Sequence, residues 1–257
     1  MKLYLHFAAM HLKSRMAYRR SFFLYLIGQF LSAFASFAVL YFLLNRFGDI
    51  NGYTLPECLL CASVVWMAFS LAECFFRGFD CFPRLVRRAE FDRMLVRPRG
   101  LVFQVLCQEM EFARLGKLIQ AALMLGIGIP LSGVEWTLLR CLCLLAMVLG
   151  GTAVFAGLFM LYAALSFFTM EGQECLNCLT YGARDSCMYP MDVYGEAVLK
   201  FGTYLIPYAL FQYYPLLYLL GRGPAWYGWL ALLAPLFLLP CCGAWRVGLR
   251  RYQSAGS

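Results

Sequence analysis

Long runs of apolar residues constrain this 257-residue chain more than any other feature. Residues 22–44 contain no charged side chain, and a helix needs roughly 20 apolar residues to cross the hydrocarbon core of a bilayer. The whole chain is 62% hydrophobic and 14% charged, whereas a soluble domain carries about 25% charged residues. These features predict an all-α integral membrane protein.

Further apolar segments follow the first one along the chain. All the segments together occupy residues 22–44, 59–76, 118–131, 138–168, 201–220 and 226–245. The third is short and reaches spanning length only if residues from 110 onward join it. The fifth is interrupted by Pro207 and Pro215. The pattern predicts six transmembrane helices in a single domain.

Lysine and arginine residues are concentrated on one side of these segments. They cluster in residues 1–20, in residues 77–100 and in the tail after the last segment. Because cytoplasmic loops of membrane proteins are enriched in both residue types, both termini and residues 77–100 are predicted to be cytoplasmic. The net charge of +8 reflects mostly this bias, and it would attract anionic lipid headgroups. Nucleic-acid binding is disfavoured because no basic face belongs to a soluble fold.

Residues 1–20 do not resemble a signal peptide, because the first apolar core begins only after them and is too long. Lys2, His6 and Lys13 share one stripe of a helical wheel, with Leu3 and Phe7 beside it. This pattern predicts an interfacial helix lying on the inner leaflet. The alternative is a basic leader that only sets the topology.

No catalytic motif is present. A phosphate-binding loop requires G-x-x-x-x-G-K-[ST], and the Gly116-Lys117 pair lacks both the earlier glycine and the following hydroxyl. His6 and His11 do not share a helical face, which disfavours a histidine metal site. We therefore expect no catalytic residue, metal or cofactor in this chain.

The cysteines include two pairs with the C-x-x-C spacing of zinc sites. These are Cys58 with Cys61, and Cys175 with Cys178. The first pair opens an apolar segment, where a divalent ion would need two more ligands nearby. We interpret the cysteines as small apolar packing residues.

Several ionisable residues lie in or beside the apolar segments. They are Glu73, Glu109, Glu111, Arg114, Lys117 and Arg140. All lie near segment ends or in the approach to the third segment, so we expect them to reach the membrane interface. A secondary transporter is disfavoured, because such proteins usually keep an ionisable group near the bilayer midplane.

The arginine-rich segment, residues 84–99, separates the second and third apolar segments. Pro83 can begin a helix and Pro98 can stop one. Phe91, Met94 and Leu95 recur at helical spacing and would form an apolar ridge among the charges. The pattern predicts a cytoplasmic docking helix over residues 84–95. The alternative is a solvated loop that only enforces topology.

Four strings in this chain resemble a known family. They are E-F-D-R-M-L-V-R-P at 90–98, Y-P-M-D-V-Y at 189–194, I-P-Y-A-L-F-Q-Y-Y-P at 206–215 and R-R-Y-Q-S-A-G-S at 250–257. Their order and spacing are similar to those of ABC-2 type permeases, in a bacterial branch with six spans. The resemblance covers nearly the whole chain. Each string alone is weakly specific, whereas their order and spacing together are more specific.

The resemblance implies the permease subunit of an ATP-driven exporter of small or lipophilic substrates in the bacterial inner membrane. ATP and Mg²⁺ would bind a separate ATPase dimer, and a second, like or unlike, permease would complete the complex. The alternative is a non-transporting membrane scaffold that recruits a cytoplasmic partner through residues 84–98. The residues do not identify the substrate.

The resemblance also assigns roles to residues. The docking residues of the coupling helix would be Glu90, Phe91, Asp92, Met94, Leu95, Arg97 and Pro98. Asp92 and Arg97 would fix its angle. Residues 171–189 would form the fifth span and 190–220 a re-entrant hairpin. An outer gate would contain Pro207, Tyr208, Tyr213, Tyr214 and Pro215, although an aromatic belt at the interface is the alternative.

The domain 1–257 is thereby divided into seven parts. They are an interfacial helix (1–20), spans one and two (21–76), a cytoplasmic coupling loop (77–100), spans three and four (101–168), span five with the hairpin (169–222), span six (223–246) and a cytoplasmic tail (247–257).

Overall fold

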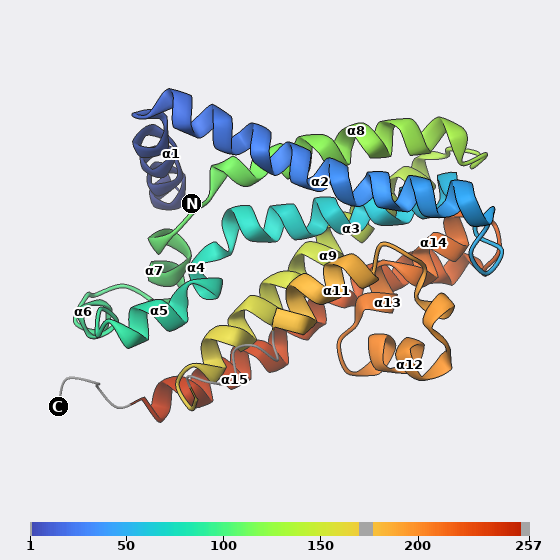
Figure 1. The fold of residues 1–257 in the computed structure, drawn as a ribbon. Helices are drawn as coiled ribbons and strands as arrows, with labels where there is room; N and C mark the ends of the chain where they lie inside the picture. Colours follow the sequence, from blue (N-terminus) through green and yellow to red (C-terminus); the bar gives the residue numbers. More distant parts are fainter. Residues whose placement is uncertain (1, 170–176, 253–257) are drawn as a thin grey trace.

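A computed structural model describes residues 2–169 and 177–252 as helices joined by turns, and no strand forms within these ranges (Figure 1). The long elements are α2 (Arg19–Phe47), α3 (Leu55–Phe75), α8 (Leu115–Leu131) and α9 (Leu138–Leu165), followed near the C-terminus by η4 (Ala225–Leu232), η5 (Ala234–Phe237) and α15 (Leu238–Arg250). Among the described residues, five helical segments are long and apolar enough to cross a membrane. The all-α membrane class is confirmed, but six spans are not.

The boundaries of these helices follow local chemistry. α2 ends at Gly48, whose φ of 88° suits glycine. α3 begins after Thr54, whose amide donates to the Glu57 carboxylate at 2.9 Å. The 3₁₀ turn η1 (Phe112–Arg114) extends α8 backwards, so that a candidate span covers Phe112–Leu131. The third span therefore recruits residues after 110, as predicted.

Helix α3 occupies the centre of the bundle. It packs against α2 and α8 on one side and against α9 on the other (Figure 1). In its most apolar window 78% of residues are buried, against 17% for α2, which places α2 at the periphery. An added Cβ at Gly116 would meet the backbone of α2, and one at Gly151 would lie 2.8 Å from Ala68 Cβ of α3. Small residues thus allow close helix approach.

The N-terminal helix and the arginine-rich segment lie at one end of the bundle (Figure 1). The short helices at this end are α1 (Lys2–Met16), α4 (Arg77–Asp80), α5 (Phe82–Arg87), α6 (Asp92–Leu95) and α7 (Leu101–Gln108). α1 crosses the end of α2 and contacts α7, where the His11 ring lies 2.8 Å from the Cys107 carbonyl. α15 ends here too (Figure 1), and the cytoplasmic orientation of this end stays a prediction. The interfacial position of α1 stays a prediction.

The expected fifth span, residues 201–220, is not one helix. The chain instead forms η3 (Met191–Tyr194), α12 (Glu196–Tyr204), α13 (Tyr208–Phe211) and α14 (Tyr213–Leu219). Pro207 lacks the N–H that a continuous helix would need. The single-helix prediction is therefore wrong for this segment.

Both ends of this broken segment lie at the same end of the bundle, opposite α1. The Tyr53 hydroxyl donates to Asp192 at 2.9 Å, and Arg222 pairs with Glu57 at 2.7 Å. The segment therefore enters and leaves at one end, and its re-entry into the membrane stays a prediction. Of the predicted span 171–189, the structure describes η2 (Cys178–Gly182), a π-helical turn, and α11 (Ala183–Ser186). Residues 170–176, with Glu171, Glu174 and Cys175, lie outside the described residues.

Gln212 joins the broken segment to the bundle. It is fully buried between α13 and α14, and its Nε2 donates to the carbonyls of Cys187 at 3.1 Å and Tyr189 at 2.7 Å. Irregular backbone inside a membrane protein needs such partners.

Replacing Gln212 with leucine is expected to lower the melting temperature of the purified protein. The change removes this donor from the partly buried Tyr189 carbonyl and leaves the Cys187 carbonyl with only the weak Cys61 thiol donor, and a buried group left unsatisfied costs about 1–3 kcal/mol. Thermal unfolding in detergent measures the shift. Gln108→Leu, at an exposed position of α7, is the matched control and should melt like the parent. Equal melting of both variants would contradict the role of Gln212.

Candidate functional site

The arginine-rich segment is a pair of short helices. α5 ends in a turn where Ala89 adopts a φ of 53°. The Glu90 amide donates to the Leu85 carbonyl at 3.0 Å, which closes α5 in the manner of a Schellman turn. α6 begins only after this turn. The predicted continuous helix over residues 84–95 is therefore wrong.

Two of the three predicted ridge residues face the protein interior. Phe91 is fully buried and Met94 is 4% exposed, whereas Leu95 is 43% exposed. The Phe91 ring packs edge-on against Phe82 and Tyr252, each at a centroid distance of 5.0 Å. An aromatic side chain gains more from such packing than from exposure to water. The prediction that Phe91 and Met94 are exposed docking knobs is wrong.

These rings belong to an aromatic cluster drawn from distant parts of the chain. Its members are Phe79, Phe82, Phe91, Phe167, Trp245 and Tyr252, and neighbouring ring centroids lie 4.9 to 5.7 Å apart. The Tyr252 hydroxyl also donates to Asp92 at 3.0 Å. Burial and the nearby Asp92 carboxylate raise the pKa of Tyr252 to about 12, so the phenol keeps its proton. Asp92 thus fixes the segment against this chain's own C-terminal part.

The exposed patch of the segment follows Phe91 and Met94 in the sequence. It consists of Leu95, Val96, Arg97 and Pro98. Val96 is 83% exposed, and Glu90 is half-buried beside the patch. The Gln104 side chain supports the backbone from within, donating to the carbonyls of Met94 at 3.1 Å and Arg99 at 2.9 Å. The patch is therefore an exposed surface on a fixed base.

A charge network joins α3, α4 and the start of α8. Its members are Glu73, Arg77, Asp80, Glu111, Arg114 and Lys117. Glu73 is fully buried, with Lys117 Nζ 3.0 Å from one carboxylate oxygen and Arg114 Nη1 3.4 Å from the other. Arg77 Nη1 approaches to 3.8 Å. Three cations around one buried carboxylate form an interior site rather than a surface ion pair.

Two further carboxylates balance these cations. Glu111 Oε2 lies 3.3 Å from Arg77 and 3.2 Å from Arg114. Burial would raise the pKa of Glu111, but the two guanidinium groups outweigh it and hold the pKa below its ordinary value. Asp80 accepts from Arg77 and from the Tyr181 hydroxyl. Burial nevertheless raises the pKa of Asp80.

The network corrects the expectation that Glu73 and Lys117 reach the membrane interface. They pair inside the protein, because each neutralises a charge that would be costly to bury alone. Glu109, paired with Arg84 at 3.1 Å, and Arg140 do keep partial exposure. The sequence contained a signal for this pairing, because Glu73 and Lys117 carry opposite charges near the facing ends of two consecutive spans. The network ties α3, α4 and α8 into one unit.

The predicted outer-gate residues are brought together by α13 and α14. Pro207, Tyr208 and Pro215 are buried, and the Tyr208 hydroxyl donates to the Leu179 carbonyl inside the bundle. Tyr213 and Tyr214 are half-buried, with ring centroids 5.2 Å apart. Their gating role stays a prediction.

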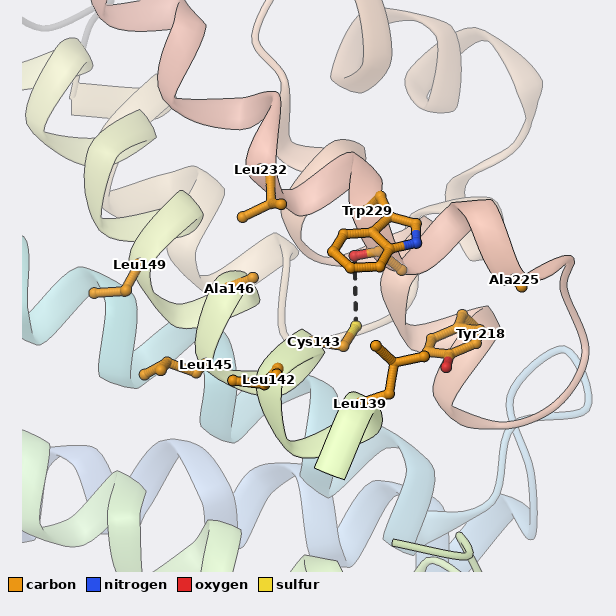
Figure 2. A pocket seen from close by; sticks show the side chains of 11 residues that line it. Leu139, Leu142, Cys143, Leu145, Ala146, Leu149, Tyr218, Ala225, Trp229 and Leu232 are labelled. Carbon is orange, nitrogen blue, oxygen red and sulfur yellow. Dashed lines mark hydrogen bonds between the residues drawn. The ribbon is translucent and has the colours of Figure 1, made fainter. Parts of the chain in front are cut away.

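An apolar groove of about 300 Å³ lies between α9 and the 3₁₀ segment η4 (Figure 2). Leucine side chains from α9 face Trp229 and Leu232 of η4 across it. The Cys143 thiol donates to the Gly228 carbonyl at 3.6 Å, which holds the two walls together. The groove matches the chemistry of an acyl chain or another lipophilic group.

The cysteines do not assemble a metal site in the part of the chain that the structure describes. No group of three or more His, Cys, Asp or Glu side chains there is placed to hold an ion. Cys58 and Cys61 are buried against other helices, in keeping with a packing role.

Comparison of the chain with known proteins identifies its family. No curated protein and no solved structure matches the chain. A family described as "ABC-2 family transporter protein" matches residues 30–256. The match extends from within α2, through the arginine-rich segment and the broken segment, to residue 256. The chain therefore belongs to the ABC-2 family of membrane transporters.

Proposed function

We propose that this chain is the permease subunit of an ATP-driven exporter whose ATP and Mg²⁺ bind a separate ATPase dimer. One observation carries the proposal: the exposed patch at 95–98 rests on a base that is joined to the spans. Force applied to the patch passes through the aromatic cluster to α15. The charge network connects the adjoining α4 to α3 and α8. Rigid elements joined in this way transmit a partner's motion to the membrane domain.

The other parts of the proposal rest on separate observations. A second permease subunit would complete the pathway, as is usual in the family. The apolar groove between α9 and η4 supports a small or lipophilic substrate. Inner-membrane localisation with cytoplasmic termini is supported by the grouping of α1, the arginine-rich segment and the end of α15 at one end of the bundle.

Co-purification tests the ATPase partner. The tagged chain is extracted from native membranes in mild detergent, and the bound proteins are identified by mass spectrometry. We expect a P-loop ATPase, and we expect Leu95→Glu with Val96→Glu to release it, because two charges replace the apolar part of the patch. Val102→Glu, at a partly exposed position of α7, is the control and should retain the ATPase. Binding of a different cytoplasmic protein, with no ATPase, would favour the scaffold instead.

A further inference from the structure

A second polar site lies deeper in the bundle, where α2, α3 and α8 meet. We call it the polar junction and define it by Trp66, Ser70 and Gln120. Ser70 precedes Glu73 by one helical turn on α3, and Gln120 follows Lys117 by one turn on α8. α3 and α8 run antiparallel and pack closely (Figure 1), so the Glu73–Lys117 pair fixes Ser70 and Gln120 at one level.

The polar atoms of the junction are enclosed and lack partners. Ser70 and Trp66 are each 1% exposed, and Gln120 is fully buried. Across the described parts of the chain, no protein group forms a hydrogen bond with Trp66 Nε1, Ser70 Oγ or either amide atom of Gln120. Buried polar side chains in proteins are almost always hydrogen-bonded. An isolated glutamine with neither amide atom satisfied requires an explanation.

Neighbouring side chains contact the ring of Trp66, whereas its N–H has no partner within the described protein. The Arg184 guanidinium lies 4.4 Å from the ring centroid, and Lys117 Nζ lies 5.8 Å from it. Phe37 of α2 closes another side, with centroids 6.1 Å apart. Cations bind the face of an indole, which leaves the N–H at its edge available to an acceptor.

We propose that the polar junction is a binding site for internal water molecules. Water is small, and it can both donate to Ser70 Oγ and Gln120 Oε1 and accept from Trp66 Nε1 and Gln120 Nε2. It would also help to solvate the adjacent Glu73–Lys117 pair. The proposal does not depend on an ATPase partner or on transport.

Radiolytic footprinting of the intact chain in lipid nanodiscs tests for this water. Hydroxyl radicals formed from bound water oxidise neighbouring side chains even where these are buried, and mass spectrometry measures the rate at each residue. Trp245 is the matched control, because it is 3% exposed and is surrounded by the rings of the aromatic cluster. We expect Trp66 to be oxidised several-fold faster than Trp245.

Two variants extend the test. Ser70→Ala with Gln120→Leu removes polar lining and should reduce oxidation of Trp66 toward the rate at Trp245. Gln120→Leu alone should not raise the melting temperature, since a hydrated amide carries little desolvation cost. Oxidation of Trp66 no faster than that of Trp245 in the parent protein would overturn the proposal, as would a rise in melting temperature on Gln120→Leu. If the double variant does not fold, the comparison within the parent protein decides alone.

Discussion

Replacing Glu73 with glutamine is expected to destabilise this permease more than any other single change of charge. The substitution leaves Lys117, Arg77 and Arg114 around a neutral side chain inside the protein. Removing one partner of a buried ion pair costs about 3–5 kcal/mol, which corresponds to a fall in melting temperature of roughly 10 °C for a domain of this size. Thermal unfolding of the purified protein measures the effect.

Two further variants show whether the loss comes from buried charge. Lys117→Met in the Glu73→Gln background removes one uncompensated cation and should recover part of the lost stability. Glu196→Gln breaks an ion pair to Lys200 in which both side chains are exposed, and such pairs contribute at most about 1 kcal/mol. If Glu73→Gln melted no earlier than Glu196→Gln, the network would not be a buried site.

Replacing Phe91 with alanine is expected to produce the second large loss. Phe91 is fully buried, and truncating a buried phenylalanine costs about 3–5 kcal/mol. The loss should also release Tyr252, so that trypsin cleaves faster at Arg250 and Arg251. Melting temperature and the rate of cleavage are the two measurements.

The control for this prediction is Leu95→Ala in the exposed patch. Because Leu95 keeps 43% of its surface exposed, its truncation should leave both measurements close to the parent values. A Phe91→Ala protein that melts and is cleaved like the parent, but loses a bound partner, would restore Phe91 as a docking residue.

The long elements of this fold could be predicted from the sequence because bilayer-spanning helices need continuous apolar length. Residues 22–44 and 138–168 contain that length. The first range lies within α2, and the second nearly coincides with α9. The grouping of the basic segments at one end followed from the positions of lysine and arginine. These are local properties, so a single sequence displays them directly.

The errors arose where distant residues decide the local structure. Helical spacing placed Phe91 and Met94 on a ridge beside Leu95, and nothing nearby in the sequence indicates that Phe167, Trp245 and Tyr252 would enclose Phe91. Pro207 and Pro215 indicated a break in the fifth segment, but nothing nearby in the sequence indicates that Gln212 would donate to the carbonyls of Cys187 and Tyr189. Such contacts depend on how the helices pack.

The hydrogen bond between Asp92 and Tyr252 joins residues 160 positions apart, and this separation sets an order of assembly. A ribosome synthesises the arginine-rich segment long before Trp245 and Tyr252 exist to pack against Phe91. Until the last helix is in place, the base of the exposed patch is incomplete. A partner that requires the finished base would engage completed chains and pass over those still being made.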